Sequence, residues 1–351
     1  FFHGSSGAIV LTTKGSFRDC SSWFHCVLIV DTTESVDTDR VKLFINGVQV
    51  EYTASTFPTS SEAFYLWNVS GQVNIVGQAD PSYVTFDGYM AEVHSIDGVA
   101  YPATTFGEFD DYGVWRPIEV DGVTYGNNGF YLDFADSSAL GNDVSGNNND
   151  LTSSGLAAAD QVLDTPTLNY CTFNPLNKAA TYTLSDGALT TLQSATSSRN
   201  ATGCTMYCGP TGKFYFEIEC VTQANEVQIG VMGLSMDMLL NDPASTANSW
   251  WWRAADGSTY GNTVSGTTLA TYTSGDVISI AVDMDASKIW MGKNGTWQNS
   301  GDPAAGTGEI FDTLPDYVSP VFNAYLAGKG TLNCGQVDFA HTVPTGFNHI
   351  N

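Results

Sequence analysis

The chain has 351 residues, of which 42% are hydrophobic and 12% aromatic, so it is long enough for two domains with cores and too apolar to be disordered. Only 14% of the residues are charged, and 37 acidic against 12 basic side chains give a net charge of −25. Such a charge repels nucleic acid and anionic membranes, and no apolar run approaches the ~20 residues of a membrane span, so nucleic-acid binding and membrane insertion are disfavoured. Because charges are sparse, we expect a surface covered mainly by Ser, Thr, Asn, Gln and Gly.

Residues 1–110 are predicted to form strands and turns. Residues 23–31 and 40–45 are apolar runs joined by a polar loop, and the second run ends at Asn46-Gly47. Asn-Gly between apolar runs is the strongest short signal for a β-hairpin, because a type I′ turn needs a positive φ at both central residues. The other predicted elements of this part are strands over residues 71–77 and 86–98, and one helical turn near residues 103–109 capped by Thr104.

Residues 111–169 are predicted to form a polar connector with a short strand at residues 130–134. The connector is rich in side-chain oxygens, carried by Asp133, Asp136, Asp143, Asn147, Asn149 and Asp150. Calcium prefers about six to eight oxygen ligands on a flexible loop, although the strict spacing of an EF-hand loop is absent here. A calcium site and a solvated turn are the two interpretations of this cluster. Asp87, beside Gly88, is a further candidate metal ligand, and no other cofactor is predicted.

Residues 170–351 return to strand patterns. Residues 277–283 and 288–291 are apolar runs that end before Asn294-Gly295, so the hairpin pattern of the first part occurs a second time. Two hairpins of one design predict an all-β chain of two β-sandwich domains in series, residues 1–110 and 170–351, joined by the connector. Such sandwiches usually present loops for binding.

Residues 213–221 alternate between apolar and polar side chains, which places Glu217 and Glu219 on one face of a strand. Concanavalin-like glucanases place their catalytic acids on a strand in this manner, because an acid and a nucleophile must flank one bond. Those enzymes need a third carboxylate three residues further on, where this chain has Thr222. A solvated strand face is therefore the preferred interpretation, and the chain is predicted not to be an enzyme.

Three consecutive indoles and a guanidinium stand between strand patterns, at Trp250, Trp251, Trp252 and Arg253. Alternate residues of a strand face opposite ways, so at least one of these indoles is expected to be exposed or at an interface. Aromatic side chains and Arg are favoured at binding hot spots. A binding or subunit contact and a local packing cluster are both compatible with the pattern. Tyr65 and Trp67 are a second candidate for ligand contact.

The seven cysteines have no regular spacing and an odd count, which does not indicate a disulfide framework. Cys204 and Cys208 are four residues apart, but no second pair with zinc spacing lies near them. Structural thiols or one local disulfide explain this pair better than zinc does.

Residues 212–218, 227–231, 275–283, 289–295 and 318–321 resemble a SPRY domain in order and spacing, over roughly 180 residues. The resemblance implies a non-catalytic sandwich that binds partners through its inter-strand loops. Residues 23–31, 42–47 and 86–93 resemble the later strands of a concanavalin-like (laminin-G-type) lectin sandwich. The early strands of that fold are absent, and the chain begins at Phe1 within a strand pattern, so we expect that its N-terminal part is missing from the sequence.

The whole arrangement, including residues 130–134, 145–150, 164–167 and 169–176, is similar to a group of tailed-phage virion proteins. This resemblance implies a tail-fibre or head-fibre appendage that binds a host surface glycan or protein. The expected partners are then other virion subunits and copies of the same chain, with a trimer as one option. The alternatives are a capsid decoration or connector protein without a receptor, and a glycan depolymerase.

Overall fold

The computed structural model describes residues 2–4, 7–17, 19, 22–63, 75–77, 86, 88–194, 199–223, 226–238 and 246–351. The regular structure of these residues is β, apart from three single-turn 3₁₀ helices: η1 (Asp37–Asp39), η2 (Ala103–Thr105) and η3 (Ala158–Asp160). The predicted all-β class is confirmed. No helix in this described part is long and apolar enough to cross a membrane. The chain divides into two compact units, residues 1–86 with 90–161, and residues 87–89 with 162–351.

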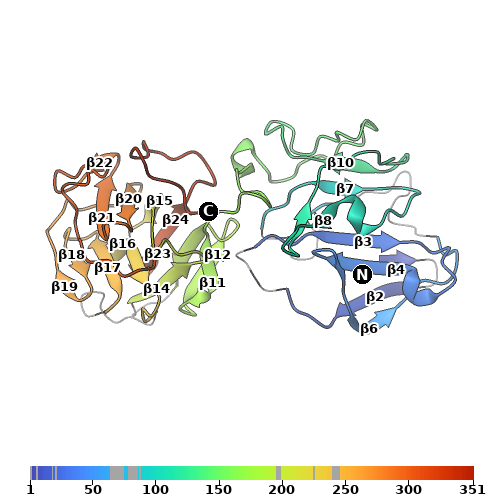
Figure 1. Cartoon of the computed structure of the whole chain (residues 1–351), viewed down its shortest axis with the longest axis horizontal. Coiled ribbons are helices and arrows are strands. Elements are labelled where there is room, and N and C mark those ends of the chain that lie inside the picture. The colour runs from blue at the N-terminus through green and yellow to red at the C-terminus, as the bar shows by residue number, and fades with distance from the viewer. Residues whose placement is uncertain are drawn as a thin grey trace. The chain divides into compact units, whose positions relative to one another are not determined.

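The first unit contains small antiparallel sheets (Figure 1). Two of them have three strands each: β1 (Phe2–Gly4), β2 (Gly7–Thr13) and β6 (Tyr52–Thr56), and β3 (Cys26–Val30), β4 (Val41–Ile45) and β5 (Val48–Gln49). Two are strand pairs: β7 (Val93–Ser95) with β10 (Phe130–Leu132), and β8 (Gly107–Phe109) with β9 (Trp115–Pro117). Because β10 pairs with β7, the stretch that the sequence indicates as a connector folds as part of the first unit up to residue 161.

The local predictions for this unit differ from the structure in two details. The strand expected over residues 86–98 is only the three residues of β7, and most of the strand expected over residues 71–77 lies outside the described residues. The helical turn exists as η2, but Pro102 occupies its N-cap position and no side chain caps it. Thr104 lies inside the turn, so its prediction as the cap is wrong.

The two hairpins share one design, as the sequence predicts. In the first, β4 turns into β5 at Asn46 and Gly47, whose φ angles are 48° and 74°. In the second, which runs through β20 (Val277–Asp283), β21 (Lys288–Lys293) and β22 (Thr296–Trp297), the φ angles of Asn294 and Gly295 are 47° and 77°. The Oδ1 atoms of Asn46 and Asn294 each accept a hydrogen bond of 2.8 Å from a backbone amide on the facing side of the hairpin.

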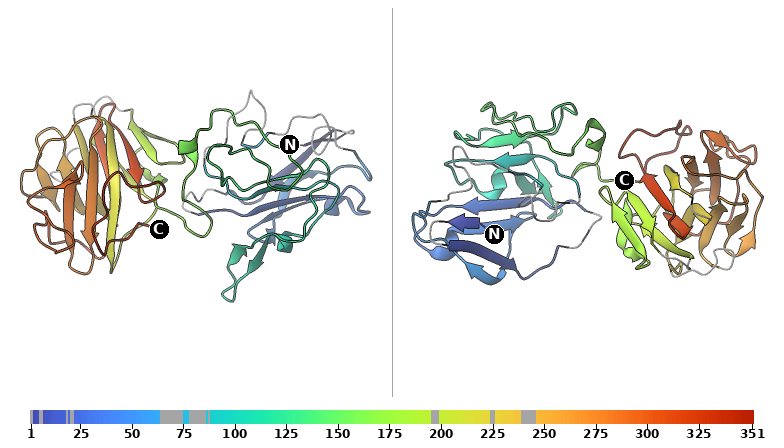
Figure 2. Two further views of the ribbon diagram at one scale, coloured as in Figure 1. Left: turned by 90° about the horizontal axis from the view of Figure 1, so that it is seen from above. Right: turned by 180° about the vertical axis from the view of Figure 1, so that it is seen from behind.

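The second unit is a sandwich of two seven-stranded sheets, seen as two layers in Figure 2. The first sheet has the order β11-β14-β23-β16-β17-β18-β19, and the second has the order β12-β13-β24-β15-β20-β21-β22. The further strands of the first sheet are β11 (Phe173–Lys178), β14 (Arg199–Cys204), β16 (Glu226–Gly233), β17 (Ser249–Arg253), β18 (Thr259–Gly261), β19 (Val264–Ser265) and β23 (Val318–Tyr325). Those of the second are β12 (Tyr182–Ser185), β13 (Thr190–Gln193), β15 (Lys213–Thr222) and β24 (Lys329–Asn333).

The central strand β15 is covered on both faces. Phe216 and Ile218 are fully buried in the core between the two sheets. On the opposite face Tyr215 packs in a second cluster with Phe347, and Phe339 packs against that cluster. Glu217 on this face is only 2% exposed, so the prediction that it lies on a solvated face is wrong. The cover is supplied by residues 338–348, here called the C-terminal segment, which lie far from β15 in the sequence.

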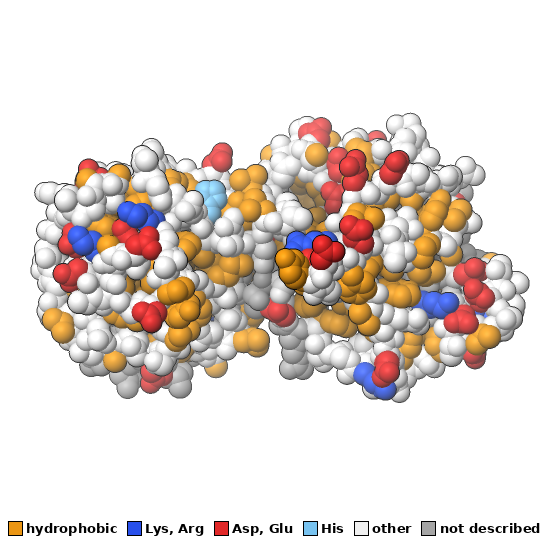
Figure 3. Space-filling model, in the orientation of Figure 1, with side chains coloured by type: hydrophobic (Ala, Val, Ile, Leu, Met, Phe, Trp, Pro, Cys, Tyr) orange, Lys and Arg blue, Asp and Glu red, His pale blue; other side chains and the backbone are white. Residues whose placement is uncertain are grey.

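The surface has few charges, as the composition predicts. On the face shown in Figure 3, charged side chains are scattered, and most of the area is backbone, uncharged polar or hydrophobic side chains.

Candidate functional site

A cleft of about 470 Å³ lies on the outer face of β15, β20, β21 and β22 in the second unit, and we call it the outer cleft. One side is formed by the C-terminal segment and the other by β22 and the loop that follows it. The lining residues most important for its chemistry are Tyr215, Ser279, Trp297, Asp302, Ala304 and His341.

The floor of the outer cleft is a buried hydrogen-bond network. The Tyr215 hydroxyl donates to Glu217 Oε1 at 2.6 Å and lies 3.0 Å from Ser279 Oγ. Burial, together with the hydrogen bond to Glu217, raises the pKa of Tyr215 well above its usual value. The floor therefore consists of buried hydroxyl groups that are already bonded to one another and to Glu217.

The C-terminal segment is held in place through Glu217. Its two carboxylate oxygens accept hydrogen bonds from the backbone amides of Ala340 at 2.8 Å and His341 at 3.0 Å. Further along, Asn348 pairs with β15: its amide donates to Lys213 O at 2.9 Å, and its carbonyl accepts from Tyr215 N at 2.8 Å. With three donors on its two oxygens, Glu217 is placed to anchor this wall rather than to exchange protons with a substrate.

The opposite wall carries the aromatic group of the outer cleft. Trp297 is half-buried and meets Tyr215 edge to face, with ring centroids 6.3 Å apart. Asp302 follows in the next loop, where its Oδ1 accepts the Ala305 amide at 3.0 Å and so fixes the turn. Ala304 is exposed and lines the same wall.

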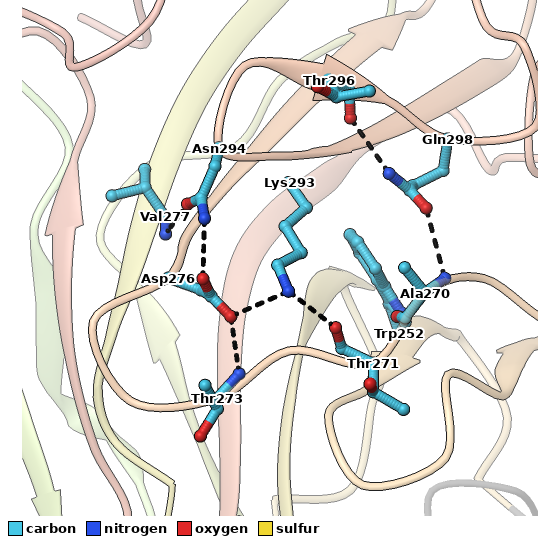
Figure 4. Close-up of polar contacts among 10 residues, drawn as sticks. All are labelled: Trp252, Ala270, Thr271, Thr273, Asp276, Val277, Lys293, Asn294, Thr296 and Gln298. Atoms are coloured by element: carbon cyan, nitrogen blue, oxygen red, sulfur yellow. Dashed lines mark hydrogen bonds and ion pairs between the residues drawn. The ribbon is translucent and has the colours of Figure 1, made fainter.

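Hydrogen bonds and one ion pair join the hairpin of β20 and β21 to the loop before it (Figure 4). Lys293 Nζ lies 3.1 Å from Asp276 Oδ2 and donates to Thr271 O at 2.9 Å. Asn294 Nδ2 donates to Asp276 Oδ1 at 2.7 Å, and the Thr273 amide donates to Asp276 Oδ2 at 2.8 Å. Partial burial opposes the ionisation of Asp276, but these hydrogen bonds and Lys293 lower its pKa. The hairpin that supports the outer cleft is therefore fixed by a charged anchor.

The charges of the outer cleft favour a neutral or basic ligand. Asp302 is the acidic side chain of its lining, and among the described residues that line it none is Lys or Arg. The His341 ring lies against the hairpin turn, since a Cβ on Gly295 would stand 3.0 Å from His341 Nδ1. The site therefore combines a partly exposed aromatic wall, a buried hydroxyl floor and one exposed carboxylate.

Of the two interpretations of the tryptophan cluster, the side chains lie as the local packing cluster requires, because all three indoles are buried. Trp250, Trp251 and Trp252 lie in β17 and are 2%, 0% and 0% exposed. Trp250 and Trp252 face the core between the sheets, while Trp251 packs on the outer face among Ala201, Met232, Met236 and Val321. The exposed indole that was one alternative of the expectation is not found, because the outer face of this sheet has its own apolar cover. Arg253 ends the strand and forms an ion pair with Asp256.

The oxygen-rich cluster of the first unit is a hydrogen-bonded loop. Asp143 is 6% exposed and accepts the backbone amides of Tyr131, Ser145 and Asn149 at 2.8 to 2.9 Å. The side-chain amides of Asn147 and Asn149 both donate to Gly129 O, at 2.9 and 2.8 Å. Asp143 N also donates to Asp150 Oδ1 at 2.9 Å, so these four side chains are brought together.

Asp133 and Asp136 are not part of that network. Asp133 Oδ1 accepts the Ala135 amide at 3.0 Å, and Asp136 Oδ1 accepts the Ser138 amide at 2.9 Å, so each caps its own turn. Within the described ranges no group of three or more His, Cys, Asp or Glu is arranged to hold a metal ion. Calcium binding stays a prediction. Tyr65, Trp67 and Asp87 lie outside the described residues.

An aromatic stack in the first unit surrounds His94 on β7. Its ring lies 4.2 Å from that of Tyr131, and its Nδ1 is 2.8 Å from the Tyr125 hydroxyl. Tyr131 in turn donates to Glu92. Burial, with a smaller contribution from the charge of His25, lowers the pKa of His94 to about 4.

We expect the first unit to lose stability as the pH falls from about 6.5 to 4 because of His94. In this window the imidazole of the unfolded chain takes up a proton and that of the folded chain does not. Protonation therefore stabilises the unfolded state relative to the folded state. After allowance for the partial exposure of the ring, the loss between pH 7 and 5 is about 1 kcal/mol. Thermal unfolding at both pH values measures it, with His94→Phe as the matched variant. An equal pH dependence in wild type and variant would contradict this assignment.

Sequence reasoning missed the outer cleft because its lining comes from separate segments between residues 215 and 345. No spacing rule joins Tyr215 to Trp297 or His341. The alternation of residues 213–221 was the available signal, since it placed Tyr215 and Glu217 on one face, but it did not show that this face is covered.

Comparison with known proteins identifies part of the second unit. Residues 213–336 match the SPRY domain family, so the predicted SPRY domain is confirmed over this range. The SPRY domain of human HERC1 is 21% identical, with a TM-score of 0.40, over 47% of this chain and 99% of that one. The TRIM65 PSpry domain is 16% identical, with a TM-score of 0.38, over 47% of this chain and 92% of that one. No curated protein matches the chain.

Proposed function

We propose that this chain is a non-enzymatic recognition protein whose SPRY domain binds a segment of a partner protein in the outer cleft. The observation that carries the proposal is a cleft of about 470 Å³ whose floor and two walls are each fixed by hydrogen bonds. Pre-organised walls reduce the entropy lost on binding. SPRY domains are protein-interaction modules, which supports a protein partner over a glycan at this site.

The chemistry of the lining defines the partner segment. Trp297 offers an aromatic surface, and the exposed Thr342 offers a hydroxyl group for hydrogen bonds. Asp302 and a chain charge of −25 disfavour acidic segments and favour neutral or basic ones. We propose that an aliphatic or basic side chain enters the outer cleft and packs against Trp297.

The biological setting that we propose is the surface of a tailed-phage particle, as a fibre or appendage that adsorbs to the host. Its support is the resemblance of the sequence to such virion proteins, together with the lectin-like pattern of residues 23–31, 42–47 and 86–93. Electron cryo-microscopy of the particle would locate the chain. Density at an exposed tip with the outer cleft open would support adsorption, and a cleft buried against capsid subunits would make the chain a decoration protein.

Filling the outer cleft is expected to weaken peptide binding without unfolding the domain. Ala304 is exposed on the wall, so Ala304→Trp adds bulk without removing any packing. Peptides selected from a random messenger-RNA display library against the wild-type chain should bind the variant at least about tenfold more weakly, a change of about 1.4 kcal/mol. Fluorescence anisotropy with a labelled selected peptide measures the two affinities.

The control for that experiment is Val264→Ala on β19, which changes another exposed side chain, 67% exposed, in the other sheet. It should leave peptide affinity unchanged. Peptides that bind wild type and Ala304→Trp equally well would place the binding surface elsewhere and reject the outer cleft.

A further inference from the structure

Four cysteines converge at one end of the sandwich core in the second unit. Cys171, Cys204, Cys208 and Cys334 are at most 1% exposed and belong to one core cluster, which we call the thiol cluster. All four are free, so the local disulfide considered for Cys204 and Cys208 is not formed. They are not arranged as a metal-binding set among the described residues. The outer cleft does not include any of them.

Cys171 lies two residues before β11, and Cys204 is the last residue of the neighbouring strand β14. Phe173 of β11 is paired with Cys204 of β14, and the Thr205 amide donates to Thr172 O at 2.8 Å. This register places Cys171 diagonally across from Cys204, on the same face of the strand pair. The Cys171 Sγ is 3.9 Å from both Met206 O and Thr205 Oγ1, so the thiol points toward the chain that leaves β14.

Cys334 approaches Cys171 from the other sheet. It follows β24, and its amide donates to Gln336 Oε1 at 2.6 Å. The same Gln336 side chain donates through Nε2 to Cys171 O at 2.5 Å. One buried amide therefore joins the backbones of the two cysteines. Cys204 and Cys334 are the two thiols that influence the ionisation of Cys171 through hydrogen bonding, which places Cys171 between them.

The pKa values of the four thiols are shifted in different directions. Burial raises the pKa of Cys204, Cys208 and Cys334. Burial also opposes the ionisation of Cys171, but hydrogen bonds from Cys204 and Cys334 lower its pKa. Cys171 is therefore the thiol of the cluster whose ionisation its neighbours favour, and the thiolate is the reactive form in disulfide exchange.

We propose that the thiol cluster is an oxidisable site in which Cys171 forms an intramolecular disulfide with Cys204 or Cys334. A sulfur forms one such bond, so each oxidised chain carries one disulfide centred on Cys171. With a disulfide such as oxidised glutathione, the Cys171 thiolate attacks one sulfur and releases a first glutathione thiol. The neighbouring cysteine then attacks the mixed disulfide and releases the second. One disulfide breaks, one forms, and both cysteine protons end on glutathione.

Such a disulfide would be a covalent cross-link near the first strand of the sandwich. Cys171 precedes β11, the edge strand of the first sheet, whereas Cys204 ends β14 and Cys334 follows β24. Either disulfide would hold β11 to strands that are central to the fold. Because all three thiols are buried, we expect the reaction to be limited by local opening at this edge.

Disulfide mapping of the full chain tests the proposal. The native chain is incubated with oxidised glutathione, the remaining thiols are alkylated after unfolding, and tryptic peptides are analysed by mass spectrometry. We expect Cys171 to lose its alkylation and to appear in a peptide linked to Cys204 or Cys334, with reversal by dithiothreitol. Cys171 that stays fully alkylated, or that is found only as a glutathione adduct, would overturn the proposal.

Two variants sharpen the result. Cys171→Ser should abolish disulfides within the thiol cluster, with Cys171→Ala as the replacement if the buried hydroxyl prevents folding. Cys220→Ser changes a thiol that is equally buried in the same core but does not contact Cys171, so the disulfide should form as in wild type. A disulfide between Cys204 and Cys208 that persists in the Cys171 variants would show that Cys171 is not the centre of the cluster.

Discussion

Replacing Trp251 by alanine is expected to destabilise the second unit by about 3–5 kcal/mol, a large part of the stability of a typical domain. Trp251 is fully buried in β17, paired with Gly230 on one side and Tyr260 on the other. Its ring fills the outer-face cluster with Met232 and Met236. Alanine leaves a cavity that the strand pairing prevents from collapsing. Urea unfolding followed by near-ultraviolet circular dichroism measures the loss.

Two further variants separate packing from binding at this position. Trp251→Phe keeps an aromatic ring and should cost less than the alanine change. Val264→Ala, at an exposed position, should change stability by less than about 0.5 kcal/mol. A Trp251→Ala protein that keeps wild-type stability but fails to bind partners would restore the interpretation of this cluster as a binding surface.

Replacing Glu217 by alanine is expected to release the C-terminal segment and open the outer cleft. The change removes the acceptor of the Ala340 and His341 amides and of the Tyr215 hydroxyl. Of the three donors only the Tyr215 hydroxyl is fully buried, and leaving a buried donor without a partner costs about 1–3 kcal/mol, so we expect a loss of about that size. Hydrogen exchange at the Ala340 and His341 amides should become faster by about a hundredfold or more.

The matched control is Glu219→Ala, because Glu219 lies two residues away on the same strand and is exposed. It should leave exchange at both amides unchanged. Unaltered protection in the Glu217 variant would mean that Phe339 and Phe347 alone hold the C-terminal segment, and that Glu217 is not its anchor.

The pattern-based predictions succeeded where the signal is local. Asn46-Gly47 and Asn294-Gly295 predict their turns because positive φ at two successive positions strongly restricts the residues that fit there. Strict alternation over residues 213–221 predicts a strand, since side chains project with a period of two whatever lies beyond them. The all-β class follows from the same kind of signal, repeated along the chain, whereas the SPRY domain was predicted from a resemblance to that family.

Whether the face of a strand is buried, in contrast, depends on segments that are distant in the sequence. Glu217 was expected to be solvated and is buried because residues 338–348 fold back over β15. At least one of the three indoles was expected to be exposed or at an interface, but Trp251 is buried because Met236 and its neighbours close the outer face of β17. The outer cleft depends on the same C-terminal segment, because residues 338–348 form one of its walls.

The sequence by itself therefore determined the secondary structure class, the repeated hairpin design and the SPRY domain. Only the tertiary structure decided which polar and aromatic side chains are buried, where the outer cleft lies and which thiols meet. The physical reason is that turn geometry and strand periodicity depend on neighbouring residues, whereas burial depends on which remote segment packs against a face.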